Sequence, residues 1–350
     1  MTVIPPEFTV AELKEEDKYE GREIDANIAA SLPEGVDVIW VSTYGATHWS
    51  ISTKIDTIVN GEEKSFFLKE YRDVNAEAMV KAEYESTAAL YAISPQNVPE
   101  PIGYGSFASD AQRFFYVQVF CDMNEDLPEV DNFVTVLSKF HAKQSPDGQF
   151  GFHITTFQGN IPQNNSWTHT WEEYFARGLQ DMIDRERSIQ GSDPEMTELS
   201  AKLMSHVVPR LLRPMETAGK RIKPVLLHGD LWHGNVSIDN VSGDPIFYDA
   251  GSFYGHGEYD AGPWRATRYR FDKTHLRAYH KLVDISEPVE DHDDRNALYA
   301  LKNDLLVSCC WKNTKSTRQL AINEMRRLVT KYPDGYEGYV ASNSQPAAGA

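Results

Sequence analysis

The chain has 350 residues, which is enough for two lobes that each bury a core, because single domains typically have about 100 to 200 residues. Acidic residues outnumber basic ones by 52 to 34, so we expect no nucleic-acid partner and no binding to anionic membrane surfaces. The acidity fits a cationic partner, such as an amine-bearing metabolite or a basic protein, and it fits equally well a surface charge that serves only solubility.

Residues 1–121 are expected to form a small antiparallel sheet crossed by one helix. The helix is predicted at residues 75–93, where apolar residues recur at near-helical spacing until Pro95. Runs rich in β-branched and aromatic residues predict strands, with a short turn at Gly45 between the first two. These strands are expected at residues 36–44, 49–59, 64–71, 102–107 and 113–120.

Residues 122–340 are expected to form a larger, mainly α-helical lobe, so the predicted fold class is α+β. Short apolar runs at residues 225–227 and 246–248 each end at a cluster of polar residues, where we expect the chemistry. Residues 341–350 are small and polar and are predicted to be a flexible tail. Helices are predicted at residues 133–142, 171–186, 195–212, 274–282, 295–311 and 317–332.

The three cysteines, Cys121, Cys309 and Cys310, do not have the spacing of a disulfide framework, which indicates a reducing compartment. The N-terminal stretch has neither the basic nor the apolar region of a signal peptide. No window approaches the roughly 18 apolar residues of a membrane span. We therefore expect a cytoplasmic location.

The most informative segment is LHGDLWHGN at residues 227–235, in which Asp230 precedes Asn235 by five positions and Asp249 follows the next short strand. Phosphoryl transfer requires a carboxylate near the acceptor hydroxyl and oxygen ligands that hold Mg²⁺ against the phosphates of ATP. Protein kinases use this spacing of Asp and Asn for those two tasks. The pattern therefore predicts Asp230 as the base and Asn235 with Asp249 as magnesium ligands.

An alternative interpretation is that His228, Asp230 and His233 form a polar turn or a transition-metal site. The two histidines are five positions apart rather than the four of a helical zinc motif, and no cysteine lies nearby in the sequence, which argues against zinc. We expect His228 to hydrogen-bond to the backbone and to shape the catalytic loop.

In the first lobe, Lys69 lies near the end of an apolar strand and Glu83 lies on the helix that follows. The carboxylate of Glu83 could hold the ammonium of Lys69 toward the phosphates of ATP, as the Lys–Glu pair of protein kinases does. Glu85 is the competing partner, but it lies on a different face of the predicted helix. The alternative is that both members of the pair are surface residues.

A hairpin that covers phosphate is expected at residues 42–50, between the first two strands. Its one glycine, Gly45, makes the signal weak, because loops that approach phosphate through backbone N–H groups usually contain several glycines. A plain β-turn is the alternative.

Five stretches that span most of the chain together form a specific pattern. They are LLHGDLWHGN (226–235), IFYDAGSFYGHGEYD (246–260), GFHITTFQGNIPQNNSWTHTWEEYF (151–175), FFLKEY (66–71) and AEYES (82–86). In these stretches the chain resembles the fructosamine-3-kinase and ketosamine kinase family, which is related to aminoglycoside phosphotransferases, and it is most similar to the fungal members. This resemblance implies a bilobal protein-kinase-like fold.

The resemblance implies transfer of the γ-phosphate of ATP, with Mg²⁺, to the 3-hydroxyl of a ketosamine. The acceptor would be a ribulosamine or fructosamine, either a small molecule or a glycated lysine of a protein. Phosphate on O3 lies β to the C2 carbonyl, so elimination would release the sugar and restore the amine. Alternatives are a kinase for another hydroxyl substrate, such as an aminoglycoside or a fungal metabolite, and a catalytically silent kinase-like binding protein.

The resemblance also assigns roles to residues: Asp230 as proton acceptor, Asn235 and Asp249 as Mg²⁺ ligands, and Lys69 with Glu83 as the pair that orients phosphate. Trp232 either stacks on the sugar or belongs to the core. Further candidates are Gly45 and Cys121 for the nucleotide, the latter in the connection where adenine should lie, and His233 and Trp167 for the substrate. The polar residues 163–165 either contact substrate or form a capping turn before a helix.

The chain departs from the family pattern at two places. Where relatives often have Asp-Pro-Ala, it has Asp249, Ala250 and Gly251. The expected phosphate loop, residues 42–50, contains no cysteine, so a redox switch located there in relatives is not expected here.

Overall fold

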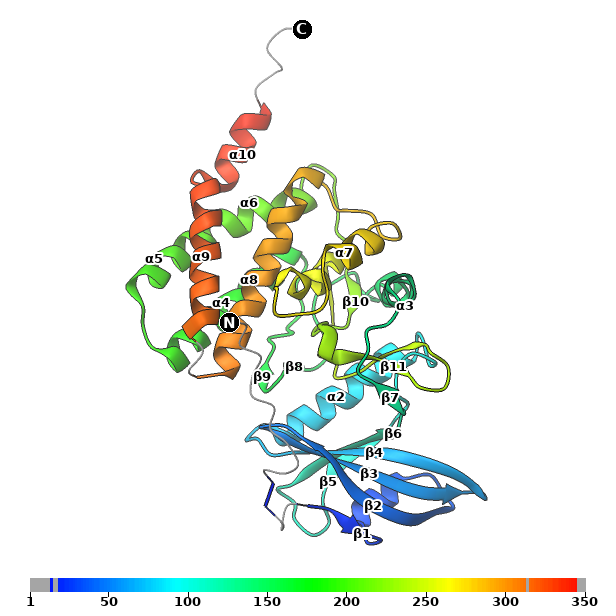
Figure 1. Cartoon of the computed structure of the whole chain (residues 1–350). Coiled ribbons are helices and arrows are strands. Elements are labelled where there is room, and N and C mark those ends of the chain that lie inside the picture. The colour runs from blue at the N-terminus through cyan, green and yellow to red at the C-terminus, as the bar shows by residue number, and fades with distance from the viewer. Residues whose placement is uncertain (1–12, 15–17, 313–314, 345–350) are drawn as a thin grey trace.

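The structure, a computed structural model, describes residues 13–14, 18–312 and 315–344. In this part of the chain, six strands form the antiparallel sheet of the N-terminal lobe, in the order β1-β2-β3-β4-β6-β5 (Figure 1). The predicted strands are confirmed, and β1 is an additional two-residue strand. The strands are β1 (Glu20–Gly21), β2 (Val36–Ala46), β3 (Ser50–Val59), β4 (Glu62–Tyr71), β5 (Pro101–Ser106) and β6 (Phe114–Val119).

Side chains along β4 alternate between the two faces of the sheet, and the two faces pack against different helices. Phe66 and Leu68 point to one face and belong to a core with the helix α1 (Ala26–Ser31). Lys69 and Tyr71 have the opposite parity, and Tyr71 packs with the helix α2 (Ala76–Tyr91). The strand therefore directs Lys69 toward α2, on the side of the sheet that faces the other lobe (Figure 1).

The expectation of one helix in this lobe was incomplete. The predicted helix at residues 75–93 is α2, but the structure adds α1, whose first turn is capped by the side chain of Asp25. A helix of six residues is shorter than two turns, so its apolar spacing gives no usable signal.

The chain crosses between the lobes after β6. It next forms β7 (Met123–Asn124), which pairs with β11 (Val236–Asp239) of the C-terminal lobe. The expected boundary between residues 121 and 122 falls within this crossing. β11 also pairs with β12 (Pro245–Phe247), and β10 (Val225–Leu227) pairs with β13 (Phe253–Gly255). These short ladders fix the segments that carry the polar clusters.

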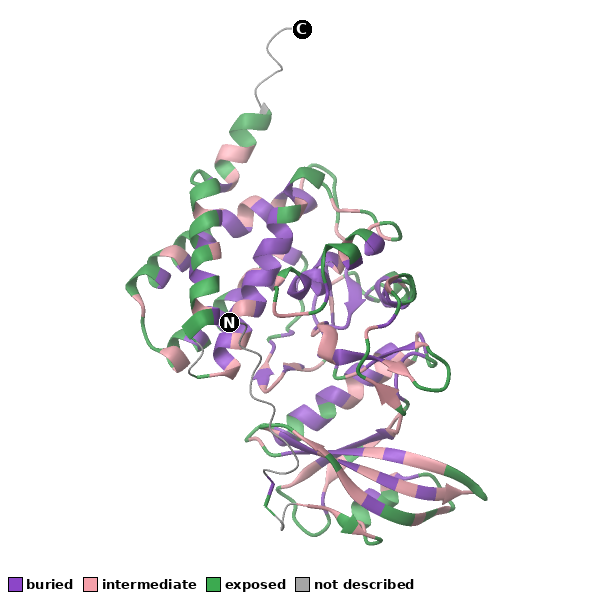
Figure 2. Ribbon diagram, in the orientation of Figure 1, coloured by how far each residue is buried: buried purple, intermediate pink, exposed green. Residues whose placement is uncertain are grey.

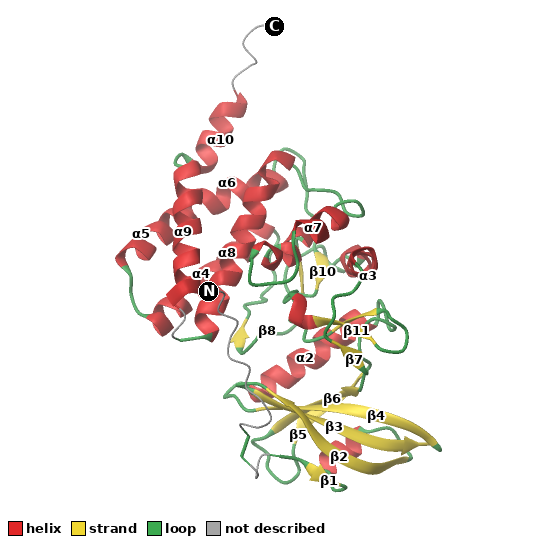
Figure 3. Ribbon diagram, in the orientation of Figure 1, coloured by secondary structure: helices red, strands yellow, loops and turns green. Residues whose placement is uncertain are grey.

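The C-terminal lobe is mainly helical, as predicted (Figure 3), and its core runs along α4 and α8, whose inner faces are buried (Figure 2). The core also includes Leu90 and Val98 from the end of α2 and the loop after it, so it extends into the N-terminal segment. The helices are α3 (Val130–Ala142), α4 (Trp171–Gln190), α5 (Pro194–Lys202), α6 (Val208–Leu212), α7 (Lys273–Tyr279), α8 (His292–Cys310), α9 (Lys315–Lys331) and α10 (Gly335–Ser344).

Two details of the C-terminal lobe differ from expectation. The single helix predicted at residues 195–212 is α5 and α6 joined by a π-helical turn at Leu203–Val207. Pro209 has no N–H to donate, which weakens the regular hydrogen-bond ladder at this turn. The predicted tail began too early, because α10 continues to Ser344; residues 345–350 lie outside the described residues.

A buried ion pair anchors the segment after β13 to α8. The side chain of Arg295 is completely buried, and its Nε and Nη2 donate to the carboxylate of Glu258 at 3.0 and 3.1 Å. The same guanidinium donates to the carbonyl oxygens of Ser286 and Pro288, at 2.6 and 2.7 Å. His256 lies beside this pair, with Nε2 2.8 Å from the hydroxyl of Ser286. The cluster is satisfied on all sides, as a buried charge requires.

His256 should make stability depend on pH. Burial lowers its pKa to about 4, whereas an unfolded histidine titrates near 6.5. Between these values the unfolded chain takes up a proton that the folded protein does not, so the free energy of unfolding should fall as the pH falls. From pH 7.5 to pH 5, the wild type should lose about 2 kcal/mol more than His256→Gln, measured by urea unfolding.

The control is His169→Gln, which removes an exposed histidine and should follow the wild type at both pH values. An equal loss in the wild type and in His256→Gln would contradict the prediction.

Candidate active site

The segment 228–235 begins directly after β10 and is held at its start by one carboxylate. Asp260 accepts hydrogen bonds from the backbone N–H groups of His228 and Gly229, at 2.8 and 2.9 Å. His228 donates from Nε2 to the carbonyl oxygen of Tyr248 at 3.0 Å and accepts at Nδ1 from the N–H of Asp230 at 3.3 Å. Burial lowers the pKa of His228, which keeps the ring neutral so that it can donate and accept. The predicted loop-shaping role of His228 is confirmed.

Two glycines let backbone pack directly on backbone here. Gly229 has a φ of +84°, and a Cβ on it would lie 2.2 Å from the carbonyl oxygen of Gly251. A Cβ on Gly251 would in turn lie 2.2 Å from the carbonyl oxygen of Phe157. The side chains of Gln158 and Gln163 donate to these two glycine carbonyls, at 2.6 and 2.9 Å. The glycine at position 251, where relatives often have alanine, therefore allows the segment around β8 (Phe157–Gln158) to approach closely.

Asp230 lies in this loop, and the side chain of Asn235 contacts it. The Nδ2 of Asn235 donates to the backbone oxygen of Asp230 at 2.8 Å and to its Oδ2 at 3.2 Å. Burial, and then the charge of Asp249, raise the pKa of Asp230 to about 7. Because the amide nitrogen of Asn235 faces Asp230, its Oδ1 points elsewhere and makes no hydrogen bond within the described residues. That oxygen is available to a hard cation.

Asp249 follows β12 in a left-handed conformation, with a φ of +56°, which Asp tolerates better than most residues. Its Oδ1 lies 2.9 Å from the Nζ of Lys69, which reaches across from the N-terminal lobe. Burial alone would raise the pKa of Asp249, but the ammonium of Lys69 holds it below its usual value. The carboxylate is therefore ionised and can act as a metal ligand.

Lys69 is also paired within its own lobe. Its Nζ lies 3.1 Å from Oε1 of Glu83, and both side chains are buried. The hydroxyl of Tyr71 donates to the other oxygen of Glu83. Burial, with a contribution from the charge of Asp249, raises the pKa of Glu83 to about 7. The competing candidate, Glu85, lies instead 3.2 Å from Nε2 of His153.

These groups line a cavity of about 290 Å³ between the lobes. A second cavity of about 150 Å³ adjoins it, with a mainly apolar and aromatic wall. Both are lined by Asp230 and Trp232, and by Trp49 and Gly159. Asp230 therefore lies where a phosphate donor in the larger cavity would meet an acceptor in the smaller one.

The hairpin expected over phosphate lies at this cavity, but its turn was misplaced. Gly45 is within β2 opposite Ser52, next to a register shift, and it does not line the cavity. The turn is at residues 47–49, closed by a hydrogen bond from the N–H of Thr47 to the carbonyl oxygen of Ser50 at 2.8 Å. A β-bulge, rather than a turn, places glycine at position 45, which the local sequence does not distinguish.

The remaining residues proposed from the sequence lie in different parts of the structure. Trp232 and His233 line the second cavity together with Tyr269, whose ring centroid is 5.4 Å from that of Trp232. Trp167 is 41% exposed, stacks on Tyr254 and lines neither cavity, so its contact with substrate stays a prediction. Cys121 is half-buried in the connection after β6, and it too lines neither cavity.

Sequence reasoning missed the far wall of the second cavity. One part is the face of α8 that carries Asn303, Leu306, Val307 and Cys310, whose spacing is that of one helical stripe. That stripe was visible as a pattern, but nothing in it distinguished a cavity wall from core. The other lining residues that were not predicted are Trp49, Gln158, Gly159, Arg268, Tyr269 and Trp311.

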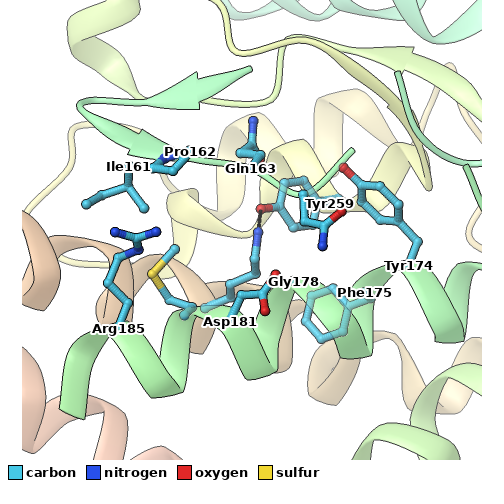
Figure 4. Close-up of a pocket in the computed structure, with 12 residues that line it drawn as sticks. Ile161, Pro162, Gln163, Tyr174, Phe175, Gly178, Asp181, Arg185 and Tyr259 are labelled. Carbon is cyan, nitrogen blue, oxygen red and sulfur yellow. Dashed lines mark hydrogen bonds between the residues drawn. The ribbon is translucent and has the colours of Figure 1, made fainter. Parts of the chain in front are cut away.

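A separate small cavity lies between α4 and the segment around β9 (Ile161–Pro162), where Asp181 and Arg185 rise from the helix (Figure 4). It includes Gln163 and Asn164, so these polar residues do not line the cavities that contain Asp230. The Nζ of Lys302 donates to the hydroxyl of Tyr259 there, at 2.8 Å.

Thr170, and none of residues 163–165, caps the start of α4. The side chain of Thr170 accepts a hydrogen bond from the N–H of Glu173, as a helix N-cap does. The neighbouring Asn165 is also structural, since its Nδ2 donates to the hydroxyl of Thr156 at 2.8 Å and its Oδ1 accepts from Tyr174 at 2.7 Å.

The sequence model of the fructosamine kinase family matches residues 50–325. The chain belongs to the fructosamine kinase family. Over 139 residues this family member is 40% identical to the ketosamine-3-kinase of Mus musculus, an alignment that covers 39% of the chain and 41% of the mouse protein. It is 26% identical over 278 residues to the chloroplastic protein-ribulosamine 3-kinase of Arabidopsis thaliana, which covers 75% of the chain and 80% of that protein.

Solved structures place this family member in a kinase-like fold. A protein assigned as a fructosamine-3-kinase from Thermobifida fusca superposes with a TM-score of 0.70 at 19% identity, covering 89% of the chain and 99% of that structure. A thermostable mutant of an aminoglycoside phosphotransferase, in a ternary complex with AMP-PNP and hygromycin B, superposes with a TM-score of 0.56 at 16% identity, covering 83% and 93%. The predicted bilobal α+β fold is confirmed; the likeness to fungal members stays a prediction.

The described residues contain no helix that is long and apolar enough to cross a membrane. They also contain no cluster of three or more His, Cys, Asp and Glu side chains that could hold a metal ion. Asn235 and Asp249 instead offer one neutral and one charged oxygen, a set that suits Mg²⁺, which keeps several waters and takes phosphate oxygens as further ligands.

The close packing at Gly229 gives a testable consequence. Gly229→Ala should destabilise the protein twice over, through its positive φ and through the clash with the carbonyl of Gly251. Gly243→Ala is the matched control, because Gly243 has a similar φ of +77° but open space around it. In urea unfolding, Gly229→Ala should lower the free energy of unfolding by about 2 kcal/mol more than the control. Equal losses would show that the backbone contact does not constrain the loop.

Proposed function

We propose that this protein is a ketosamine 3-kinase that transfers the γ-phosphate of ATP to the 3-hydroxyl of a sugar attached to an amine. The observation that carries the proposal is the position of Asp230 between a cavity lined by Lys69, Glu83 and Asp249 and a second, aromatic cavity. Membership in the fructosamine kinase family and the names of the mouse and Arabidopsis relatives support ketosamines as the acceptor class.

In the proposed reaction, the acceptor hydroxyl attacks the γ-phosphorus while the bond to the β-phosphate oxygen of ATP breaks. Asp230 accepts the hydroxyl proton, and a pKa near 7 suits a general base that works near neutral pH. Lys69, oriented by Glu83, holds the phosphates. Asn235 and Asp249 hold Mg²⁺, which neutralises charge on the phosphate oxygens when it is bound. The adenine is proposed to lie against the connection that contains Cys121.

The product has chemical consequences of its own. A phosphate on O3 can leave from C3, next to the C2 carbonyl: loss of a proton from C1 gives an enaminol that expels inorganic phosphate. Water then hydrolyses the imine formed at C1, which releases the free amine and a 3-deoxy dicarbonyl sugar. The reaction is therefore a deglycation. We further propose that the chain works in the cytoplasm, with residues 1–121 as the nucleotide-binding lobe and residues 122–340 as the catalytic and substrate lobe.

Acceptor identity is tested with a panel. Purified protein with Mg²⁺ and ATP is incubated with ribulosamine, fructosamine and aminoglycoside acceptors, and any new phosphate is located by ³¹P and ¹³C NMR. Phosphate on O3 of a ketosamine is the expected result. Label found only on an aminoglycoside would replace the proposal with a different hydroxyl kinase, and no label on any acceptor would point to a binding protein.

The base is tested separately with Asp230→Asn. The amide cannot accept the proton, so kcat should fall by at least about a hundredfold, while ATP binding measured by calorimetry is retained. Asp244→Asn, a half-buried acidic residue in the β11–β12 turn that lines neither cavity, is the control and should leave kcat unchanged. Near-native turnover by Asp230→Asn would refute the assignment.

A further inference from the structure

Arg268 is a buried cation in the wall of the second cavity, and its position is fixed from two sides. Its side chain is 8% exposed, and its Nη1 lies 2.6 Å from Oδ1 of Asp304. The guanidinium carbon lies 4.7 Å from the centre of the Tyr269 ring, close enough for a cation–π contact. The guanidinium is therefore held in place before any ligand binds.

The ion pair with Asp304 leaves part of this guanidinium unused. Neither Nε nor Nη2 of Arg268 has a hydrogen-bond partner among the described residues, although both atoms are buried. His233, in the same cavity wall, has a buried Nδ1 that is likewise unpartnered within the described chain. A buried polar atom without a partner costs about 1–3 kcal/mol, so such atoms in a cavity wall indicate a ligand that supplies the missing partner.

The rest of the wall restricts what that ligand can be. Trp49, Trp232 and Trp311 line the same cavity, and such aromatic faces accept a sugar ring, a hydrocarbon or an ammonium group. Asp230 also lines the cavity, so an acceptor that presents a hydroxyl to Asp230 can present a different group to Arg268. The guanidinium offers two adjacent N–H donors, the arrangement that matches the two oxygens of a carboxylate.

We infer that Arg268 binds the carboxylate of the acceptor, and that the preferred acceptor is a free amino acid whose α-amine carries the sugar. This inference rests on the proposed function and narrows its substrate class. In a glycated lysine of a protein, the α-carboxyl group is part of the peptide chain, so no carboxylate of that residue can reach Arg268. A free α-glycated amino acid has its carboxylate one carbon from the amine, within the same small molecule.

The experiment compares acceptors that differ only in this group. kcat/KM is measured for N-ribulosylglycine and for its uncharged amide, N-ribulosylglycinamide, with the sugar and the ATP concentration held constant. The wild type should prefer the carboxylate by at least tenfold, mainly through KM, because binding rather than the chemical step is affected. Ribulosylated N-acetyl-lysine amide, which imitates a protein side chain, should behave like the amide.

Arg268→Met should reduce this preference to less than about threefold, and Arg268→Lys should keep part of it because the charge remains. The ratio between two acceptors is insensitive to partial unfolding, which lowers both rates together. Arg265→Met is the matched control, since Arg265 forms an exposed ion pair with Asp293 and does not line this cavity. It should preserve the wild-type ratio.

The possible failures are distinguishable. If the wild type uses the carboxylate and the amide equally well, the inference is wrong while the proposed function stands. If the preference exists and persists in Arg268→Met, the carboxylate binds elsewhere and the role of Arg268 is refuted. If no ketosamine is phosphorylated at all, the proposed function itself fails.

Discussion

The loop that carries Asp230 depends on one buried carboxylate, because the side chain of Asp260 accepts hydrogen bonds from the N–H groups of both His228 and Gly229. A hydrogen bond to a charged acceptor stabilises the folded protein by about 1.5–3 kcal/mol, and two such bonds hold the start of the loop in place. The contacts of Gly229 with Gly251, and of Gly251 with Phe157, then fix the depth of the loop. The position of Asp230 is therefore set by these backbone contacts rather than by contacts of its own side chain.

The charged side chains that line the larger cavity come from both lobes. Among the described residues of its lining, Lys69 is the one cationic side chain, and the lining also contains the carboxylates of Glu83, Asp230 and Asp249. The carboxylates of Glu83 and Asp230 have raised pKa values because they are buried and lie near Asp249. A divalent cation would offset the excess of negative charge in this lining, which fits the proposed use of Mg²⁺ with ATP.

Much of the fold, and most of the charged groups that line the larger cavity, could be predicted because the sequence signals are local. The alternation in β4 and the helical spacing in α2 set the faces that carry Lys69 and Glu83, and helical geometry selected Glu83 over Glu85 correctly. The spacing within residues 227–235 indicated that Asp230 and Asn235 act together, and they lie in contact. The short strands β10 and β12 were visible as apolar runs, whereas β11 and β13 were missed because their three or four residues include polar residues or glycine and are too few to show a periodicity.

The sequence by itself determined the two lobes, the loop that carries Asp230 and the lysine–glutamate pair, since each follows from periodicity or from short spacing along the chain. Only the tertiary structure decided that Gly45 lies in a strand, that Trp167 lines neither cavity, and that Arg268, which has two buried donors without a partner among the described residues, lines a cavity with Asp230. Those facts depend on which surfaces of distant segments meet. Such meetings are set by packing of the whole core, and no local pattern records them.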